Sequence, residues 1–301
     1  MIDKKIDVVI LYVDSEDEEW VKLYQQHKHK NIEDKKEENV RYRNTSLLKW
    51  LFRSIDTNLD WINNVFLVVQ SESQVPEWIN RKTVKVVLHE EFIPKEFLPT
   101  YNSSTIEMFL HNIKDLSNNF ILCNDDFLFY NKCNVIDFFE NDKLKFGYSK
   151  KYINEVSDCL YYYGVHNTTQ AFFNYFDIKV NDNLLIVPSH YAKPFYKPNM
   201  KKCYETFKDR INESITMFRC KKNYVYMIYC LYQIKSGKFK KESPGGKAVS
   251  LRNYYKHPEK YDNFKCLCIN DNIIEGDYKK AYNKTIEILD KKFPYISKYE
   301  I

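Results

Sequence analysis

Apolar runs alternate with stretches of helical periodicity along the first half of the chain. The runs are rich in β-branched residues, which is typical of buried parallel strands. They predict strands at 6–13, 65–69, 84–88 and 120–123. Between them, amphipathic spacing predicts helices at 46–55 and 102–111, the second with Asn102 as its N-terminal cap. This alternation predicts an α/β fold with a mainly parallel sheet.

The second half of the chain shows the same pattern less regularly. An aromatic and apolar stretch within 214–234 predicts a buried helix. A further short strand is predicted at 266–269 and an amphipathic helix at 278–293. The segment 141–187 is irregular and rich in tyrosine, so we interpret it as an inserted subdomain or lid.

Length and composition fit a globular protein with a sizeable core. The chain has 301 residues, and 44% of them are hydrophobic. We predict that 1–140 and 188–301 are two parts of one α/β core, with 141–187 inserted between them. No run reaches the roughly 18 apolar residues of a membrane span. The expected location is therefore the cytoplasm, either free or docked peripherally at the inner face of the membrane.

The balance of charges argues against a nucleic-acid partner. Lys and Arg total 46 against 41 for Asp and Glu, and both signs are interspersed along the chain. The net charge of +5 indicates only a mild preference for anionic ligands. The eight cysteines show no paired CxxC spacing, so we expect reduced thiols in the core and no zinc site.

Acid and amide side chains follow two of the predicted strands. Asn124-Asp125-Asp126 ends the run at 120–123, and Asn270-Asp271-Asn272 ends the run at 266–269. Ligands of open α/β sheets bind at the carboxyl ends of strands. Two acids there suit a hard divalent cation that bridges phosphate oxygens. Taken alone, each cluster is also typical of a β-turn or a helix cap.

Three arginines offer donors for a diphosphate. Arg41 and Arg43, with Arg53 further on, carry planar groups that can hold a pyrophosphate in a bidentate fashion. Basic residues after a charged loop are, however, more often a solvated face. The sequence contains neither a GxGxxG nor a GxxxxGK[ST] phosphate loop.

Four other residues are candidates on weaker grounds. Glu107 and His111 lie four apart on one face of a predicted helix, which fits either a functional pair or a surface ion pair. His190 and Arg219 stand outside any run of charges. An isolated histidine is more often structural than catalytic, so neither residue defines a site by itself.

Taken together, these segments resemble the four conserved blocks of the Stealth family. That family includes bacterial capsule polymerases and the eukaryotic enzyme that tags lysosomal glycoproteins with GlcNAc-1-phosphate. The first block is similar to IDVVILYVDSEDEEW at 6–20. The second and longest includes RYRNTSLLKWLFRSI at 41–55, LPTYNSSTIEMFLHNI at 98–113 and FILCNDDFLF at 120–129. The third is similar to HYAKP at 190–194 with ITMFR at 215–219, and the fourth to FKCLCINDNI at 264–273.

The resemblance implies a sugar-1-phosphate transferase with a GT-A-like, Rossmann-type core. Such an enzyme transfers a hexose-1-phosphate or N-acetylhexosamine-1-phosphate from a UDP-sugar to a glycan hydroxyl, forms a phosphodiester and releases UMP. The implied setting is the synthesis of a bacterial capsule or surface polysaccharide. The implied cofactor is Mg²⁺ or Mn²⁺. The implied partners are a nucleotide-sugar donor and an oligo- or polysaccharide acceptor, free or lipid-linked.

The resemblance also assigns roles to individual residues. It implies an active centre of Glu107, Asp126, His190 and Arg219. His190 is the expected general base, because an imidazole with a near-neutral pKa can take a proton from a hydroxyl. Glu107 would either orient His190 or bind the sugar. The implied donor-binding residues are Asp14, Arg41, Arg43 and Asn102, and the expected metal ligands are Asp125, Asp126 and Asp271.

Two other functions fit the same sequence. A metal-dependent GT-A glycosyltransferase would bind the diphosphate through the same acids, attack the anomeric carbon and release UDP. A noncatalytic glycan- or nucleic-acid-binding module would use the basic and aromatic surface. The weak charge asymmetry and the clustered acids count against the binding module.

Overall fold

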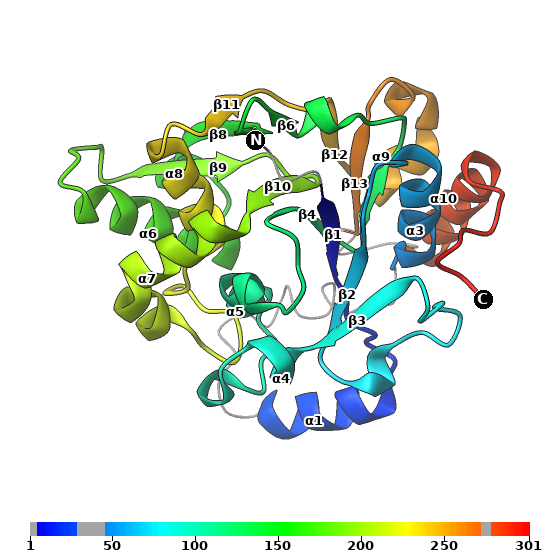
Figure 1. Cartoon of the computed structure of the whole chain (residues 1–301), viewed down its shortest axis with the longest axis horizontal. Helices are drawn as coiled ribbons and strands as arrows, with labels where there is room; N and C mark the ends of the chain where they lie inside the picture. Colours follow the sequence, from blue (N-terminus) through cyan, green and yellow to red (C-terminus); the bar gives the residue numbers. More distant parts are fainter. Residues whose placement is uncertain (1–4, 29–45, 272–277) are drawn as a thin grey trace.

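A central five-stranded sheet organises the computed structural model, which describes residues 5–28, 46–271 and 278–301 (Figure 1). The strand order is β10-β4-β1-β2-β3. The parallel strands are β1 (Ile6–Leu11), β2 (Val65–Val69), β3 (Val84–Leu88) and β4 (Asn119–Asn124). β10 (Lys193–Tyr196) runs antiparallel to β4 at one edge. The predicted α/β fold with a mainly parallel sheet is confirmed.

β1 and β2 are buried along their whole length, which is why their sequences are near-continuous apolar runs. The polar residue of β1, Asp7, is fully buried. Its carboxylate accepts hydrogen bonds from Asn63 Nδ2 at 2.8 Å and from the backbone N–H groups of Asn64 and Ser117 at 3.0 and 2.7 Å. Because these groups precede β2 and β4, Asp7 ties the starts of three strands together.

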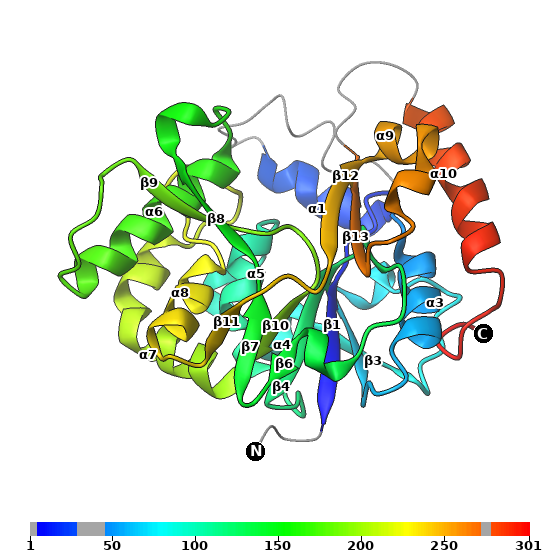
Figure 2. The ribbon, with the colours of Figure 1, turned by 90° about the horizontal axis from the view of Figure 1, so that it is seen from above.

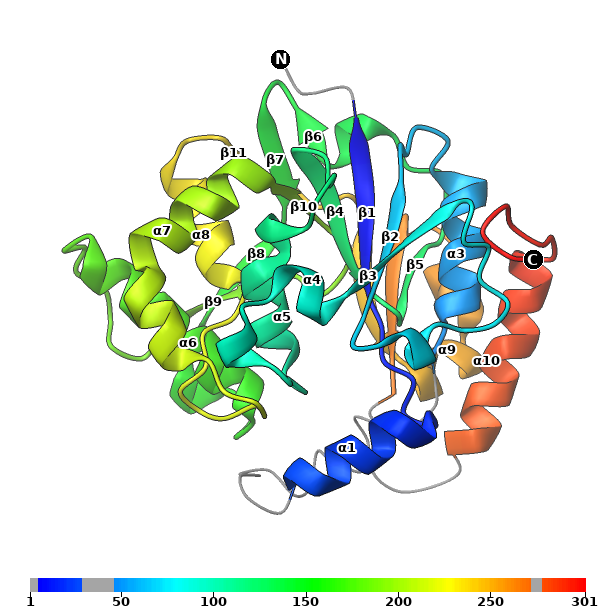
Figure 3. The ribbon, with the colours of Figure 1, turned by 60° about the horizontal axis from the view of Figure 1, so that its bottom comes forward.

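Helices lie on both sides of the central strands. The described helices are α1 (Glu18–Lys28), α3 (Leu48–Asn58), α4 (His89–Phe92), α5 (Ser103–Phe109), α6 (Leu160–Tyr175), α7 (Lys197–Ser214), α8 (Met227–Lys235), α9 (Leu251–Lys256) and α10 (Tyr278–Lys292). α3, α9 and α10 lie to one side of the sheet, and α5 to α8 lie to the other (Figures 1 and 3). α1 lies beyond the carboxyl end of β1 (Figure 2). Among the residues described, no helix is long and apolar enough to cross a membrane.

A second sheet brings the late part of the chain against the end of β4. Its strands, in order, are β12 (Gly246–Ser250), β13 (Cys266–Asn270) and β5 (Phe127–Phe129). β5 begins directly after Asp126 and pairs antiparallel with β13, so that Cys268 lies opposite Phe127. Ile269 N–H also donates to the Asp126 carbonyl oxygen at 2.9 Å. The two acid and amide clusters thus become neighbours, although Asn272 lies outside the described residues.

The segment 141–187 contains regular structure that its sequence pattern did not predict. β7 (Lys143–Phe146) pairs with β6 (Phe139–Glu140) and with β11 (Phe239–Lys241), and β8 (Tyr148–Tyr152) pairs with β9 (Leu184–Pro188). α6 lies between β8 and β9 in the sequence, and it packs on β9. The division into two core parts and an inserted subdomain or lid stays a prediction.

Arg53 has a structural role. Its guanidinium is buried and donates from Nε and Nη2 to the two carboxylate oxygens of Glu300, at 3.0 and 3.1 Å. Nη1 donates to the Phe293 carbonyl oxygen at 3.2 Å. The hypothesis that Arg53 holds a pyrophosphate is therefore wrong, because its donors already hold the end of the chain. Arg41 and Arg43 lie outside the described residues.

Replacing Arg53 by alanine should lower the free energy of unfolding by about 3 kcal/mol, the lower end of the range for breaking a buried ion pair. The buried Glu300 carboxylate would lose the guanidinium but keep the Ser297 N–H and Oγ donors at 2.9 Å. Arg81→Ala is the control. Arg81 donates to Glu72 at 2.6 Å, but these side chains are 51% and 62% exposed, so its loss should cost less than about 1 kcal/mol. Urea denaturation measures both. Unchanged stability with weakened UDP binding in Arg53→Ala would contradict the structural role.

Candidate active site

The strand order of the central sheet reverses between β1 and β4. From β1 the sheet continues through β2 on one side, while β4 lies on the other. The carboxyl ends of strands at such a point form a crevice that binds ligands in open α/β sheets. Leu11 pairs with Asn124, so the loops that begin at Tyr12 and Asp125 leave the sheet side by side.

A cavity of about 280 Å³ lies at this crevice. Asp125 and Asp126 are among the residues that line it. Aromatic and polar side chains form the rest, and they include Tyr12, Trp20, Gln70, His89, Tyr101 and Arg219. Its volume is close to the lower end of the range for small-molecule sites, roughly 300–1,000 Å³. We call it the larger cavity.

The two carboxyls of the larger cavity resist ionisation. Burial raises the pKa of Asp125 to about 6, against a hydrogen bond from Ser46 that lowers it. Burial raises the pKa of Asp126 to about 7, and the charge of Asp125 adds to this effect. The Oδ1 atom of Asp126 is buried and has no hydrogen-bond partner in the described structure. A bound cation would relieve both effects, so the pair fits a divalent ion held by oxygen ligands.

The three predicted metal ligands do not form one cluster. Among the described residues, the group whose possible ligand atoms all lie within 4.8 Å of one another is Asp126, His190 and Cys268. The register of β5 and β13 explains this, because it sets Cys268 across from the residue that follows Asp126. Asp271 lies just beyond β13 at the same edge, and Asp125 is bonded to Ser46.

A smaller cavity of about 90 Å³ adjoins the larger one. The two share Ser103, Asn124 and Arg219 in their walls. Glu107 and His190 line the smaller cavity, together with residues of α6 and residues of the loop that precedes α8. Arg219 therefore stands between the two cavities. The four residues that the resemblance assigns to the active centre are brought together along this pair of cavities.

Asn102 joins the helix that carries Glu107 to the loop that carries Arg219. It caps α5 as predicted, since its side chain accepts a hydrogen bond from Ser104 N–H at 3.1 Å. Its Nδ2 donates to the Thr216 carbonyl oxygen and to Asn223 Oδ1, at 3.2 and 3.1 Å. Asn102 is fully buried by these contacts and is not among the residues that line the larger cavity, so its contact with a donor stays a prediction.

Asp14, the other described candidate for donor binding, is partly buried in the loop after β1. Its backbone exchanges two hydrogen bonds with the side chain of Gln74, at 2.7 and 2.9 Å. Its carboxylate accepts a hydrogen bond from Glu16 N–H at 2.9 Å. Tyr12 and Val13, directly before it, line the larger cavity. Asp14 therefore lies next to this cavity and stays a candidate.

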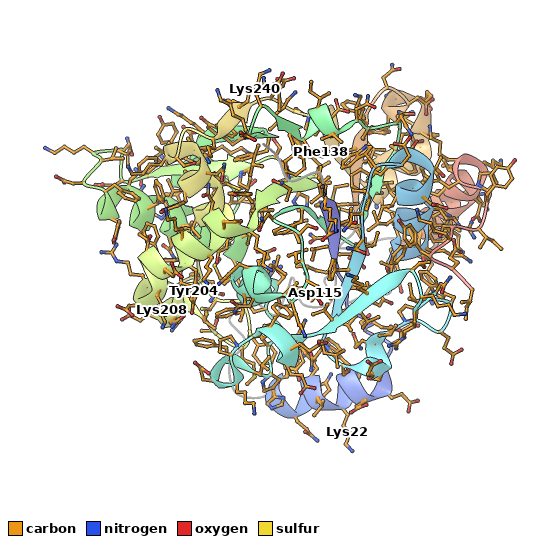
Figure 4. All side chains as sticks on the ribbon, in the orientation of Figure 1. Lys22, Asp115, Phe138, Tyr204, Lys208 and Lys240 are labelled. Carbon is orange, nitrogen blue, oxygen red and sulfur yellow. The ribbon has the colours of Figure 1, made fainter. Side chains whose placement is uncertain are left out.

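Glu107 and His111 do not form a surface ion pair. Both are buried, and Glu107 faces the smaller cavity. His111 lies in a short 3-10 helix at Leu110–Asn112, where the tighter winding removes it from the face of Glu107. Its ring packs 5.0 Å from that of Tyr204 on α7, which Figure 4 labels. The ion-pair interpretation is therefore wrong.

Burial and two cations set the charge of the smaller cavity. Burial raises the pKa of Glu107 to about 7, although Arg219 and Lys193 oppose the rise. Burial, together with Lys193 and Arg219, lowers the pKa of His190 to about 3. The expectation of a near-neutral pKa for His190 is therefore wrong for the free protein. At physiological pH the imidazole is neutral and keeps a lone pair for a proton.

Lys193 is a buried cation that sequence reasoning did not select. It is 4% exposed, and its Nζ donates to the Tyr191 carbonyl oxygen at 2.9 Å. The rings of Tyr226 and Phe127 lie 5.1 and 5.9 Å from Nζ. Burial lowers its pKa to about 8, so it remains mostly charged at neutral pH. Its position in the HYAKP segment, three residues after His190, was the available signal.

Lys193→Met should raise the pKa of Glu107 above its present value of about 7, because it removes one of the cations that favour the carboxylate. Lys145→Met is the matched control. Lys145 is also buried, but it pairs with Glu242 at 2.9 Å, outside both cavities. Titration of ¹³C-labelled glutamate side chains by NMR measures the shift, with Glu107→Gln to assign the signal. An unmoved Glu107 pKa in Lys193→Met would contradict this electrostatic account.

Comparison with known proteins places the chain in a family. Residues 41–146 match "Stealth protein CR2, conserved region 2". The capsular polysaccharide phosphotransferase CpsJ of Streptococcus thermophilus is 36% identical over 60% of this chain and 82% of its own length. The capsular polysaccharide phosphotransferase WcwK of Streptococcus pneumoniae is 28% identical over 99% of this chain and 98% of its own.

Two solved glycosyltransferase structures match the chain weakly. The galactosyltransferase LgtC is 11% identical, with a TM-score of 0.42, over 97% of this chain and 98% of its own. The glycosyltransferase GlyE of Streptococcus pneumoniae is 9% identical, with a TM-score of 0.37, over 98% of this chain and 65% of its own. Likenesses this weak carry no conclusion about the chain. The conserved region and the identity with CpsJ, in contrast, show that the chain belongs to the Stealth family.

Proposed function

We propose that the chain transfers a sugar-1-phosphate, carrying a hexose or an N-acetylhexosamine, from a UDP-sugar to a glycan hydroxyl in bacterial capsule or surface polysaccharide synthesis. Its relatives CpsJ and WcwK are capsular polysaccharide phosphotransferases, which supports the reaction class. The observation that carries the proposal is the position of Arg219 between two cavities. One holds paired carboxyls and the other a neutral histidine.

In the proposed reaction, the oxygen of an acceptor hydroxyl attacks the phosphorus that bears the sugar. The bond from this phosphorus to the oxygen that bridges the two phosphates breaks, and UMP leaves. The bond between the sugar and its own oxygen survives, so the product is a phosphodiester. Charge spreads over the phosphoryl oxygens during this transfer, and the Arg219 guanidinium stands where it can stabilise that charge.

The larger cavity is the proposed donor site. Its aromatic residues offer surfaces for a nucleotide, and Asp125 and Asp126 lie where a diphosphate with its cation would sit. The smaller cavity is the proposed acceptor site. Tyr161 and Gly164 of α6 form part of its wall, so the segment 141–187 would help to choose the acceptor.

His190 is the proposed general base. Burial is the main cause of its low pKa in the free protein, and the positive charges of Lys193 and Arg219 lower the pKa further. A bound donor brings negative phosphates that offset these charges, which raises the pKa and makes His190 a better base. No hydrogen bond joins Glu107 to His190 among the described contacts. This favours sugar binding over orientation of the base as the role of Glu107.

A divalent cation, Mg²⁺ or Mn²⁺, is the proposed cofactor. Asp125 and Asp126 would hold it, whereas Asp271 lies at the same edge but does not cluster with them. When bound, it would neutralise charge on the diphosphate of the donor. EDTA should therefore abolish transfer, and added Mg²⁺ or Mn²⁺ should restore it. Full activity in EDTA would contradict a metal requirement.

The released nucleotide tests the proposed function against its rivals. Incubation with a panel of UDP-sugars and a capsule oligosaccharide should release UMP in step with product. A glycosyltransferase on the same fold would release UDP, and a noncatalytic binding module would release neither nucleotide. Chromatography of the nucleotides at early times separates the three outcomes.

His190→Ala should reduce kcat by about a hundredfold or more, the usual range for a positioned acid or base group. Binding of UDP, measured by calorimetry, should change little, because His190 lines the smaller cavity and not the larger one. His166→Ala on α6 is the control. His166 contacts the Asp182 carbonyl oxygen at 2.6 Å outside both cavities. If His190→Ala keeps most of its turnover, another group must be the base.

A further inference from the structure

Cys268 places a thiol inside the active centre, although the proposed reaction gives it no task. It is fully buried in β13, and its Sγ lies 3.2 Å from Asp126 Oδ2 and 2.5 Å from Asn270 Oδ1, two oxygens that can accept its proton. The residue across from it in β5, Phe127, packs edge-on against the ring of His190 with centroids 5.4 Å apart. The strand pairing therefore sets a thiol, an imidazole and a carboxylate around one point.

The geometry of these three groups is close to that of a metal site. One ligand atom from each of Asp126, His190 and Cys268 lies within 4.8 Å of the other two. A tetrahedral zinc with bonds of about 2.0–2.3 Å separates its ligand atoms by about 3.3–3.8 Å, so modest side-chain rotation closes the site. The Oδ1 atom of Asp126 is buried and lacks a partner among the described residues, which leaves it free to bind an ion.

The kinds of ligand point to a soft ion. Thiolate and imidazole are the ligands that proteins use for Zn²⁺ and related transition metals, whereas Mg²⁺ prefers oxygen. Asp126 lines the larger cavity and His190 the smaller one, so an ion can reach the site through either. This differs from the oxygen site at Asp125 and Asp126.

We propose that Asp126, His190 and Cys268 form a binding site for Zn²⁺ or a similarly soft divalent ion, and that an ion bound there inhibits the enzyme. On binding, the thiol proton leaves to solvent as the Sγ bond to the metal forms, and no redox change takes place. The metal takes up the nitrogen lone pair that would accept the acceptor proton, and it takes Asp126 from the Mg²⁺ site. Inhibition rests on the proposed function, whereas binding does not.

The sequence expectation of no zinc site was based on spacing along the chain. Asp126 follows β4, His190 precedes β10 and Cys268 lies within β13, so the three ligands come from distant segments of the chain. Spacing rules detect ligands that share one loop or hairpin. They do not detect a site that strand pairing assembles.

Binding is tested with Co²⁺, which takes zinc sites and absorbs light. The full chain, stripped with EDTA and desalted, should develop a thiolate-to-cobalt charge-transfer band during titration, and Zn²⁺ should remove it. Cys268→Ser should lose the band and bind Zn²⁺ at least about tenfold more weakly, because the thiolate is the softest ligand. Cys159→Ser, which changes a partly exposed cysteine outside both cavities, should keep it. No band in the wild-type chain, or an unchanged band in Cys268→Ser, would overturn the site.

Inhibition is tested in the presence of Mg²⁺, with each variant compared to its own rate without Zn²⁺. The half-inhibiting Zn²⁺ concentration should rise at least about tenfold in Cys268→Ser and stay unchanged in Cys159→Ser. His190→Gln provides a second binding test by the cobalt band, and circular dichroism checks that each variant is folded. A cobalt band without inhibition by Zn²⁺ would keep the site but overturn its inhibitory effect, and it would also count against His190 as the base.

Discussion

The pairing of β5 with β13 decides what the active centre contains. A β-turn after β4 would leave Asn124-Asp125-Asp126 as an ordinary loop. The antiparallel pairing, with the Ile269 N–H bonded to the Asp126 carbonyl oxygen at 2.9 Å, brings Cys268 and the end of β13 against it. The contact links residues more than 140 positions apart in the chain. The carboxyl ends of β1 and β4 then supply the crevice, because the strand order reverses there.

A charge balance follows from this assembly. Asp125, Asp126 and Glu107 are carboxyls whose pKa values burial raises, while Lys193 and Arg219 are the nearby cations. A nucleotide diphosphate with a divalent cation would add both signs of charge at this point. It would favour ionisation of Asp125 and Asp126 and offset the two cations, so binding of the donor would itself prepare the groups for transfer. The free protein therefore keeps several ionisable groups buried, which is unfavourable until a charged ligand binds.

The sequence predicted the parallel strands of the central sheet, because buried parallel strands leave long apolar runs, but it did not predict the antiparallel edge strand β10. It did not predict α6. The buried face of that helix contains Gly164, Thr168 and Thr169. The hydroxyls of the two threonines donate hydrogen bonds to the carbonyl oxygens four residues earlier in the helix, at 2.7 and 2.8 Å. Polar and small residues on the inner face hide the amphipathic pattern. α7 was not predicted either, although the apolar residues at helical spacing from Met200 to Ile211 were a signal for it.

For the site, sequence and structure contributed different information. Resemblance to the Stealth blocks selected Glu107, Asp126, His190 and Arg219, and the structure brings these four residues together along two cavities. Sequence reasoning did not select Lys193, although its place in the HYAKP segment was a signal. It could not reveal Cys268 as part of the centre, because a cysteine in an apolar run looks like core until the partner strand is known. Nor could sequence spacing show that the Arg53 guanidinium would pair with the Glu300 carboxylate.

The central claim is that phosphorus, and not the anomeric carbon, is attacked. A UDP-sugar labelled with ¹⁸O in the oxygen between the sugar and its phosphate tests this most directly, because later hydrolysis of UDP to UMP cannot imitate the result. Mass spectrometry of the products should find the label in the glycan phosphodiester and none in the released UMP. Label in released UDP, with an unlabelled glycosidic bond in the product, would contradict the account.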